Sequence, residues 1–303
     1  MNKVSTKAGR RRSNVSWRRR LMPYLFIAPN MAIFGTFIIY PALRGIWISF
    51  QESSDGRDFK YVGTANYKTI LHDPTIASVA KNTATYVIFY VLISTLLALT
   101  LAIIVNEQKF LKGMYRSILF LPVMLSPVVV GLIWNQVLDR KVGPLNQLLE
   151  ALGGGSPGWL VEPKLGMVAV IFTGVWVHIG FYSIILLAGL QGIDRSVLEA
   201  AAMDGATRWQ TTTKIILPLL KPTTLVIIIL STIHGFQSFD FIYTLTGGGP
   251  LGSTTLIVQY IYDRAFQTPI QYGLGSAAGV ILFMIIFAFT AMNFLAGRKK
   301  EAV

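Results

Sequence analysis

Long apolar stretches separated by short polar ones form the dominant pattern of this chain of 303 residues. A helix needs about 20 apolar residues to cross a bilayer, and six segments are long enough. The expected spans cover residues 21–50, 79–105, 115–138, 165–190, 223–246 and 274–296. The first contains Pro23, Pro29 and Pro41, so it either kinks or begins as an interfacial helix. The pattern predicts an all-α polytopic membrane protein with about six transmembrane helices.

Charges in the polar segments indicate which ends face the cytoplasm. Residues 1–20 hold eight basic side chains and no acidic one, whereas residues 51–78 hold three basic and four acidic side chains. Cytoplasmic segments carry the excess of Lys and Arg, so both termini are expected inside. We therefore divide the chain into a basic cytoplasmic segment 1–20, a transmembrane domain 21–297 with a cytoplasmic loop 191–222, and a cytoplasmic tail 298–303.

The composition supports this class and excludes several others. The chain is 53% hydrophobic and 14% charged, against about 25% charged residues in soluble domains. Its net charge of +13 comes mostly from the N-terminal segment, and no folded basic patch suggests nucleic-acid binding. There is no cysteine, and the three histidines lack metal-ligand spacing, so we expect no metal site.

The polar loop 191–222 has the local signals of two short helices. The spacing predicts one capping box at Ser196 and Glu199 and a second at Thr207 and Gln210. Gly205 lies between them and can adopt the left-handed conformation that ends a helix. Pro218 and Pro222 then allow the next span to start. These signals alone fit either a capped connector or a docking element.

The spacing over this loop resembles a known signature. Glu199-Ala200-Ala201, three residues, Gly205, nine residues, and Ile215-x-Leu217-Pro218 match the EAA motif of binding-protein-dependent ABC importer permeases. The resemblance covers nearly the whole chain and points to the carbohydrate-uptake branch that includes the maltose and glycerol-3-phosphate permeases. It is carried further by Gly-x-x-Asn-Tyr at 63–67, Leu-Ala-Gly-Leu-Gln at 187–191, Thr-Gly-Gly-Gly-Pro at 246–250 and the segment 260–266.

The resemblance implies a type I importer permease fold in the bacterial plasma (inner) membrane and a set of partners. The family pairs two permease subunits, here expected as a heterodimer, with two ABC ATPase subunits and an extracytoplasmic solute-binding protein. ATP and Mg²⁺ are expected on the ATPase, because this chain has no G-x-x-x-x-G-K-[ST] motif and no enzymatic constellation. The residues implied at the ATPase-coupling interface are Glu199, Ala200, Ala201, Asp204, Gly205, Ile215, Leu217 and Pro218.

Candidate residues for a sugar path gather on the fourth and fifth spans. An intramembrane acid such as Asp240 should face protein or water, and Phe236, Asp240 and Tyr243 follow i, i+4, i+7 on one helix. Asp240 either accepts sugar hydroxyls, bonds a neighbouring helix or caps the outer loop. The other path candidates are Gln237, Trp176, Tyr182, Trp134 and Asn135, while His178 and His234 are expected to be satisfied polar residues rather than proton relays.

The alternative reading is a stand-alone ion-coupled secondary transporter. Such a protein needs a coupling-ion site built from broken helices and paired charges near the midplane, and Asp240 is the one clear acid within a span. The polar loop 191–222 would have no role in that mechanism.

Overall fold

A computed structural model describes residues 17–107 and 112–298 of the chain, and most of them are helical. The expected N-terminal segment 1–20 and tail 298–303 lie mostly outside these described residues. The chain divides into two compact units, Met1–Trp47 and Ile48–Val303, each described here by itself.

The first unit is one long apolar helix with a local π turn. Helix α1 (Trp17–Phe34) continues through Pro23 and Pro29, is followed by the π-helical turn η1 (Gly35–Ile39), and resumes as α2 (Tyr40–Ile48). The turn ends two residues before Pro41, whose nitrogen has no N–H to donate to the preceding helical turn. Residues Met22–Ile48 are long and apolar enough to cross a membrane, so the first expected span forms as a π-bulged helix.

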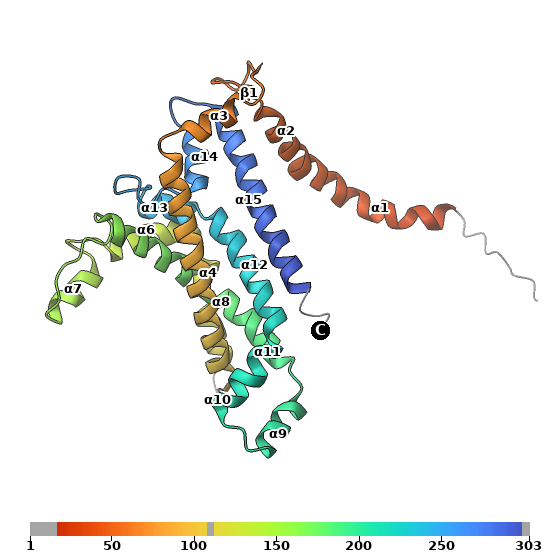
Figure 1. The fold of residues 1–303 in the computed structure, drawn as a ribbon, viewed down its shortest axis with the longest axis vertical. Helices are drawn as coiled ribbons and strands as arrows, with labels where there is room; N and C mark the ends of the chain where they lie inside the picture. Colours follow the sequence, from red (N-terminus) through yellow and green to blue (C-terminus); the bar gives the residue numbers. More distant parts are fainter. Residues whose placement is uncertain (1–16, 108–111, 299–303) are drawn as a thin grey trace, which may run out of the picture. The chain divides into compact units, whose positions relative to one another are not determined.

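The second unit is a helical bundle (Figure 1). Helix α4 (Ile76–Glu107) packs against α8 (Pro163–Gln191) and α12 (Lys221–Gln237), and α12 packs against α15 (Tyr272–Arg298). Five residues spaced four apart on α4 are fully buried; they are Tyr86, Tyr90, Ser94, Ala98 and Ala102. The last three are small, which allows close approach between membrane helices.

The two ends of the bundle differ (Figure 1). One end, which we call the hairpin end, carries the antiparallel strands β1 (Gln51–Glu52) and β2 (Lys60–Tyr61), α3 (Ala65–His72) and α14 (Ile257–Phe266). The opposite end, the α9 end, carries α9 (Arg195–Met203), α10 (Arg208–Thr211), the π turn η2 (Thr212–Ile216) and α11 (Leu217–Leu219).

The expected third span, 115–138, is not one straight helix. It consists of α5 (Lys112–Met124) and α6 (Pro127–Val137), which are bent by 97°. Pro127 causes the break, because the residue before a proline is pushed out of the helical region and Ser126 is extended, with ψ 129°. The amphipathic helix α7 (Pro144–Ala151) follows α6.

The expected fifth span, 223–246, is also interrupted, and its helix α12 stops at Gln237. The Ser238 hydroxyl donates to the His234 carbonyl at 2.8 Å and replaces the backbone bond that would continue the helix. A short helix α13 (Asp240–Leu245) follows and packs on α6. Over the described ranges, four helices are long and apolar enough to cross a membrane, or six if each of two bent pairs is one span.

Candidate functional site

Helix α9 starts from a different cap than the sequence predicts. Asp194 is the N-cap, and its carboxylate accepts from the Ser196 backbone N–H at 2.9 Å, which lowers the pKa of Asp194. The predicted Ser196–Glu199 capping box is therefore wrong: an aspartate two residues earlier already binds the free amide and favours the positive end of the helix. Glu199 therefore does not cap the helix, and its exposed carboxylate forms no hydrogen bond or ion pair with any residue that the structure describes.

The end of α9 confirms the predicted glycine turn. Gly205 has φ 74°, its N–H donates to the Ala202 carbonyl, and the Ala206 N–H donates to the Ala201 carbonyl at 3.0 Å. These two bonds make a Schellman motif, in which the glycine position takes the left-handed conformation. No atom lies within 4 Å of a Cβ added at Gly205. The glycine is therefore required here by its backbone angle and not by crowding within this chain.

The second short helix also begins as expected. Thr207 and Gln210 form the predicted capping box, with the Thr207 N–H donating to the Gln210 side chain at 2.8 Å. The helix then widens into η2, which lies directly before Leu217-Pro218, just as η1 lies before Tyr40-Pro41. At Leu220 the chain bends by 66° into α12.

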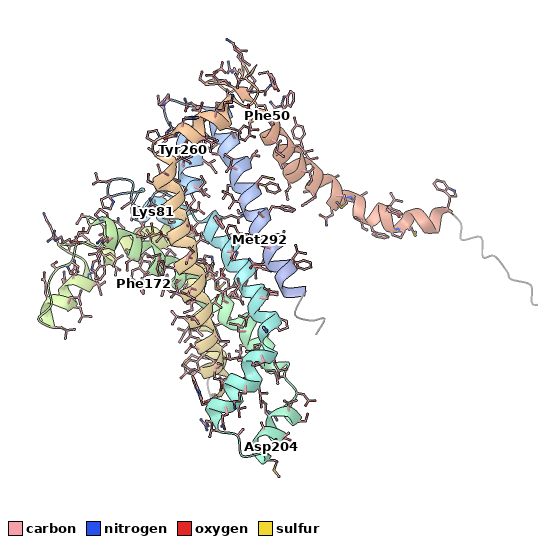
Figure 2. The ribbon with its side chains drawn as sticks, viewed as in Figure 1. Phe50, Lys81, Phe172, Asp204, Tyr260 and Met292 are labelled. Carbon is pink, nitrogen blue, oxygen red and sulfur yellow. The ribbon has the colours of Figure 1, made fainter. Side chains whose placement is uncertain are left out.

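The α9 end is an exposed platform. Met203 is 89% exposed and Trp209 is 77% exposed, although both are large and apolar, and Figure 2 labels Asp204 at the tip of this end. The predicted coupling residues Glu199, Ala200, Asp204, Gly205 and Pro218 are exposed, Ile215 and Leu217 are half-buried, and Ala201 is buried. One ion pair, Arg208 with Glu107 at 3.6 Å, links α10 to the end of α4.

The predicted stripe of Phe236, Asp240 and Tyr243 does not exist as one helix face. The interruption at Ser238 and Phe239 separates Phe236 on α12 from the other two on α13. Phe236 is buried and packs against Phe289 of α15, with ring centroids 5.6 Å apart. The helical periodicity failed here because the Ser238 side chain competes with the backbone.

The interruption instead gathers a different aromatic group. Tyr243 lies 5.4 Å from Phe239 and 5.5 Å from Tyr262, and Tyr262 lies 5.4 Å from Phe266, all between ring centroids. We call these four residues the aromatic cluster. Gln237 and Asp240 are exposed, and the Asp240 carboxylate accepts no hydrogen bond from the part of the chain that the structure describes. Phe239 and Tyr262 were missed because helical spacing does not reveal a cluster made across a break and a loop.

The remaining path candidates contribute mainly to packing. Trp134 and Trp176 meet edge to face at 5.5 Å, and Trp134 also packs on Phe172 at 5.0 Å. The Asn135 side chain donates to the Leu245 carbonyl at 2.7 Å and so ties α6 to the end of α13. This contact gives Asn135 a structural role that the sequence did not indicate.

Tyr182 lies in a buried hydrogen-bonded chain between three helices. Its hydroxyl is 2.9 Å from the Tyr90 hydroxyl of α4 and 2.8 Å from Nδ1 of His234 on α12. The ring of His178 stacks on His234 at 4.9 Å, and its Nδ1 lies 3.3 Å from the Gly174 carbonyl. Both histidines thus have hydrogen-bond partners, and Tyr182 is fully buried.

Comparisons with known proteins agree on one class. Residues 92–300 match the family described as binding-protein-dependent transport system inner membrane component. The chain is 33% identical over 290 residues to the trehalose/maltose transport system permease protein MalF of Thermococcus litoralis, covering 95% of this chain and 98% of that protein. It is 31% identical over 291 residues to the sn-glycerol-3-phosphate transport system permease protein UgpA of Agrobacterium fabrum, covering 95% and 98%.

A solved structure is similar over nearly its full length. It is a bacterial alginate ABC transporter in complex with an alginate pentasaccharide-bound periplasmic protein, and its matching chain has a TM-score of 0.81 and 26% identity. The match covers 93% of this chain and 96% of that chain.

Proposed function

The chain belongs to the family of binding-protein-dependent transport system inner membrane components, and on that basis we propose that it is one permease subunit of an ABC importer. It would form the path with a second, different permease subunit and receive its solute from an extracytoplasmic binding protein. ATP hydrolysis on two separate ATPase subunits would drive transport, with ATP and Mg²⁺ held there. The coupling signature at the exposed α9 end carries this proposal.

We place the ATPase contact on α9 and its glycine turn. A docking helix should be short, rigid at both ends and open along one face. Asp194 fixes the start of α9 and the Schellman motif at Gly205 fixes its end. Between them lie the exposed Glu199 and Met203, which offer a charge and an apolar contact to a partner. Aromatic and methionine side chains exposed in this way are typical of interface cores.

This assignment sets the proposed orientation. The ATPase is cytoplasmic in importers of this family, so the α9 end would face the cytoplasm and the hairpin end of the same unit would face outward. For the N-terminal segment, the excess of basic residues by itself favours a cytoplasmic location.

The proposed solute is a sugar or sugar-like molecule. The aromatic cluster offers ring faces that stack on the apolar faces of sugars, and the exposed Asp240 and Gln237 beside the same break offer groups for hydroxyls. Relatives named for trehalose, maltose and alginate transport fit this choice, whereas the glycerol-3-phosphate relative shows that the fold also serves a smaller polyol derivative.

ATP-driven uptake in vesicles containing the complete complex tests the proposal. We expect Glu199→Lys to abolish uptake, because it reverses the charge presented to the ATPase, and Gly205→Asp to abolish it by distorting the docking turn. Both variants should remain in the membrane at wild-type levels.

Helix α7 provides matched controls. It also ends in a Schellman motif, with Gly153 at φ 80° and no atom near its added Cβ, and with the exposed Glu150 before it. Glu150→Lys and Gly153→Asp therefore make the same chemical changes at a site outside the proposed contact, and uptake should continue. Normal uptake by the α9 variants, or uptake driven by an ion gradient without ATP, would overturn the proposal in favour of a secondary transporter.

A further inference from the structure

Helix α7 turns its apolar face away from the protein. Leu145, Leu148, Leu149 and Leu152 follow the i, i+3, i+4, i+7 spacing of one helix face. Leu148 is 57% exposed and Leu152 is 76% exposed, whereas the polar Asn146 beside this face is only 2% exposed. A helix on the surface of a soluble domain buries its apolar stripe and exposes its polar residues. The burial of α7 is therefore inverted, and its leucine face needs an apolar partner.

Hydrogen bonds of Asn146 hold α7 in this orientation. Its side-chain amide donates to the Pro157 carbonyl at 3.1 Å, and its side-chain oxygen accepts from Trp159 Nε1 at 2.9 Å. The same loop is closed by the Ser156 hydroxyl, which donates to the Arg140 carbonyl at 2.9 Å. Rolling α7 about its axis to bury the leucines would break the bonds of Asn146 and leave their partners unpaired, which is costly. The exposed leucine face is therefore a fixed feature of this loop.

The position of α7 in the chain keeps it close to a membrane surface. The loop leaves α6 at Val137 and enters α8 at Pro163; α6 is part of a bent candidate span, and α8 is a candidate span by itself. Helix α8 runs from this loop to the α9 end, so the loop lies on the other side of the membrane. Figure 1 shows α7 at the periphery of the second unit, beyond α6. An amphipathic helix tethered in this way is within reach of the lipid headgroups, where such helices rest with their apolar face in the bilayer.

The exposed apolar surface of this loop is aliphatic, which favours lipid over a protein partner. Its large exposed apolar side chains are Val142, Leu148, Leu152 and Val161. The cores of protein interfaces are instead enriched in aromatic residues, Met and Arg, as the α9 platform is, and Leu and Val are under-represented among their strongest contacts. Residues 139–164 contain three basic and three acidic side chains, so apolar contact rather than net charge must attract the partner.

We propose that α7 is an interfacial helix that inserts Leu148 and Leu152 into the lipid leaflet on the side away from the α9 end. The exposed Gln147 and Glu150 then face water and the headgroups. Inserted in this way, the leucine face lies about 5–10 Å into the boundary between headgroups and acyl chains, and α7 anchors the ends of α6 and α8 that its loop joins. The contact requires a membrane but neither ATP nor a solute, so it is independent of the proposed importer function.

Spin labels on the complete transporter in lipid nanodiscs test this contact. The chain has no cysteine, so Leu148→Cys, Leu152→Cys and Glu150→Cys each place one label on this subunit. Oxygen concentrates in lipid, whereas a nickel chelate stays in water. We expect the labels at Leu148→Cys and Leu152→Cys to be several-fold more accessible to oxygen than to the chelate. The label at Glu150→Cys, the control on the polar face of the same helix, should show the reverse.

Two results would overturn the lipid contact. Leucine-face labels that are more accessible to the chelate lie in water, and labels hidden from both reagents are covered by protein, either the second permease subunit or the binding protein.

A second variant tests whether the leucine face holds α7 in lipid. A charge is costly in the hydrocarbon, so adding Leu152→Asp to Leu148→Cys should raise the chelate accessibility of the label several-fold. Adding Glu150→Gln instead should leave it unchanged. An unchanged label in the Leu152→Asp variant would also overturn the proposal. A failure of ATP-driven uptake would not alter these accessibilities, so the two proposals fail separately.

Discussion

Asp73 joins the corner before α4 to helix α14 through four hydrogen bonds. Its Oδ2 accepts from the Tyr260 hydroxyl at 2.8 Å and from Arg264 at 2.6 Å, while its Oδ1 accepts from the Thr75 N–H and hydroxyl at 2.9 and 2.7 Å. Desolvation raises the pKa of Asp73, but the bonds from Thr75 and Tyr260 and the charge of Arg264 outweigh it, so the pKa lies below its ordinary value. The charged form therefore favours the folded chain.

The sign of this pKa shift predicts how stability depends on pH. The contribution is complete above the unfolded pKa of about 3.8 and is lost as pH falls through the lower folded pKa. In thermal unfolding of the protein in detergent, Asp73→Asn should lower stability at pH 7 by about 1.5–3 kcal/mol and flatten the decline below pH 4. Tyr260→Phe removes one hydrogen bond but keeps the ion pair between Asp73 and Arg264, so it should lower the stability by less. An acid profile of Asp73→Asn that follows wild type would contradict the assignment.

At single positions, prediction from sequence succeeded where one residue decides the local geometry. Gly205 ends α9 because glycine adopts φ 74° without steric cost, and that can be inferred without knowing any neighbour. The start of α9 was misassigned because two polar residues, Asp194 and Ser196, compete for the cap, and the aspartate prevails through its charge. The role of Asp73 could not be predicted from sequence, because its partners Tyr260 and Arg264 lie far along the chain.

At the scale of elements, the α9 platform meets the bundle at one tight junction. Leu220, at the bend into α12, is 1% exposed. A Cβ added to Gly189 near the end of α8 would lie 2.8 Å from Thr223 Oγ1 and 3.2 Å from a Leu220 methyl group. The two helices that flank the platform therefore touch where the platform is attached, and a movement of α9 reaches α8 and α12 at this point.

This junction makes a prediction about coupling between ATP hydrolysis and transport. Gly189→Ala should push the start of α12 away from α8 and reduce the solute transported per ATP several-fold, because close-packed helices do not absorb an added methyl group freely. Thr223→Ala removes the two nearest atoms that the new Cβ would meet and leaves the Leu220 methyl group at 3.2 Å, so the double variant Gly189→Ala with Thr223→Ala should recover most of the coupling. Coupling in Gly189→Ala equal to wild type, or no recovery in the pair, would show that the junction does not transmit the movement.

The elements themselves were predictable in number but not in continuity. Hydropathy located every apolar stretch, and α4, α8 and α15 follow the expected spans closely. Hydropathy did not reveal the break before Pro127 or the one at Ser238. It is averaged over about the length of a whole span, whereas a single residue is enough to end a helix. Both π turns precede a proline by two residues, which is a local signal that sequence analysis can use.

At the scale of the whole molecule, the arrangement of the bundle depends on contacts between helices distant in sequence. The aromatic cluster forms only after α14 has packed beside the break between α12 and α13. Apolar periodicity carries no information about this, since membrane helices are apolar on all sides and no polar face marks the partner. Hydropathy predicted the all-α membrane class and the family resemblance implied the importer fold, whereas the aromatic cluster could be located only in the structure.

The buried chain from Tyr90 through Tyr182 to His234 joins α4, α8 and α12 near the centre of the bundle. Interhelical hydrogen bonds in membrane proteins contribute about 0.6 kcal/mol on average and up to about 1.7. Tyr182→Phe removes both bonds of the chain, so it should lower the free energy of unfolding in lipid or detergent by about 1–2 kcal/mol. Tyr86→Phe is the control of equal size. It removes only the 3.1 Å hydrogen bond between the Tyr86 and Ser238 hydroxyls, and the Ser238 hydroxyl still donates to the His234 carbonyl. It should cost less than half as much, and equal losses in the two variants would mean that ring packing, not the hydrogen-bonded chain, holds these three helices together.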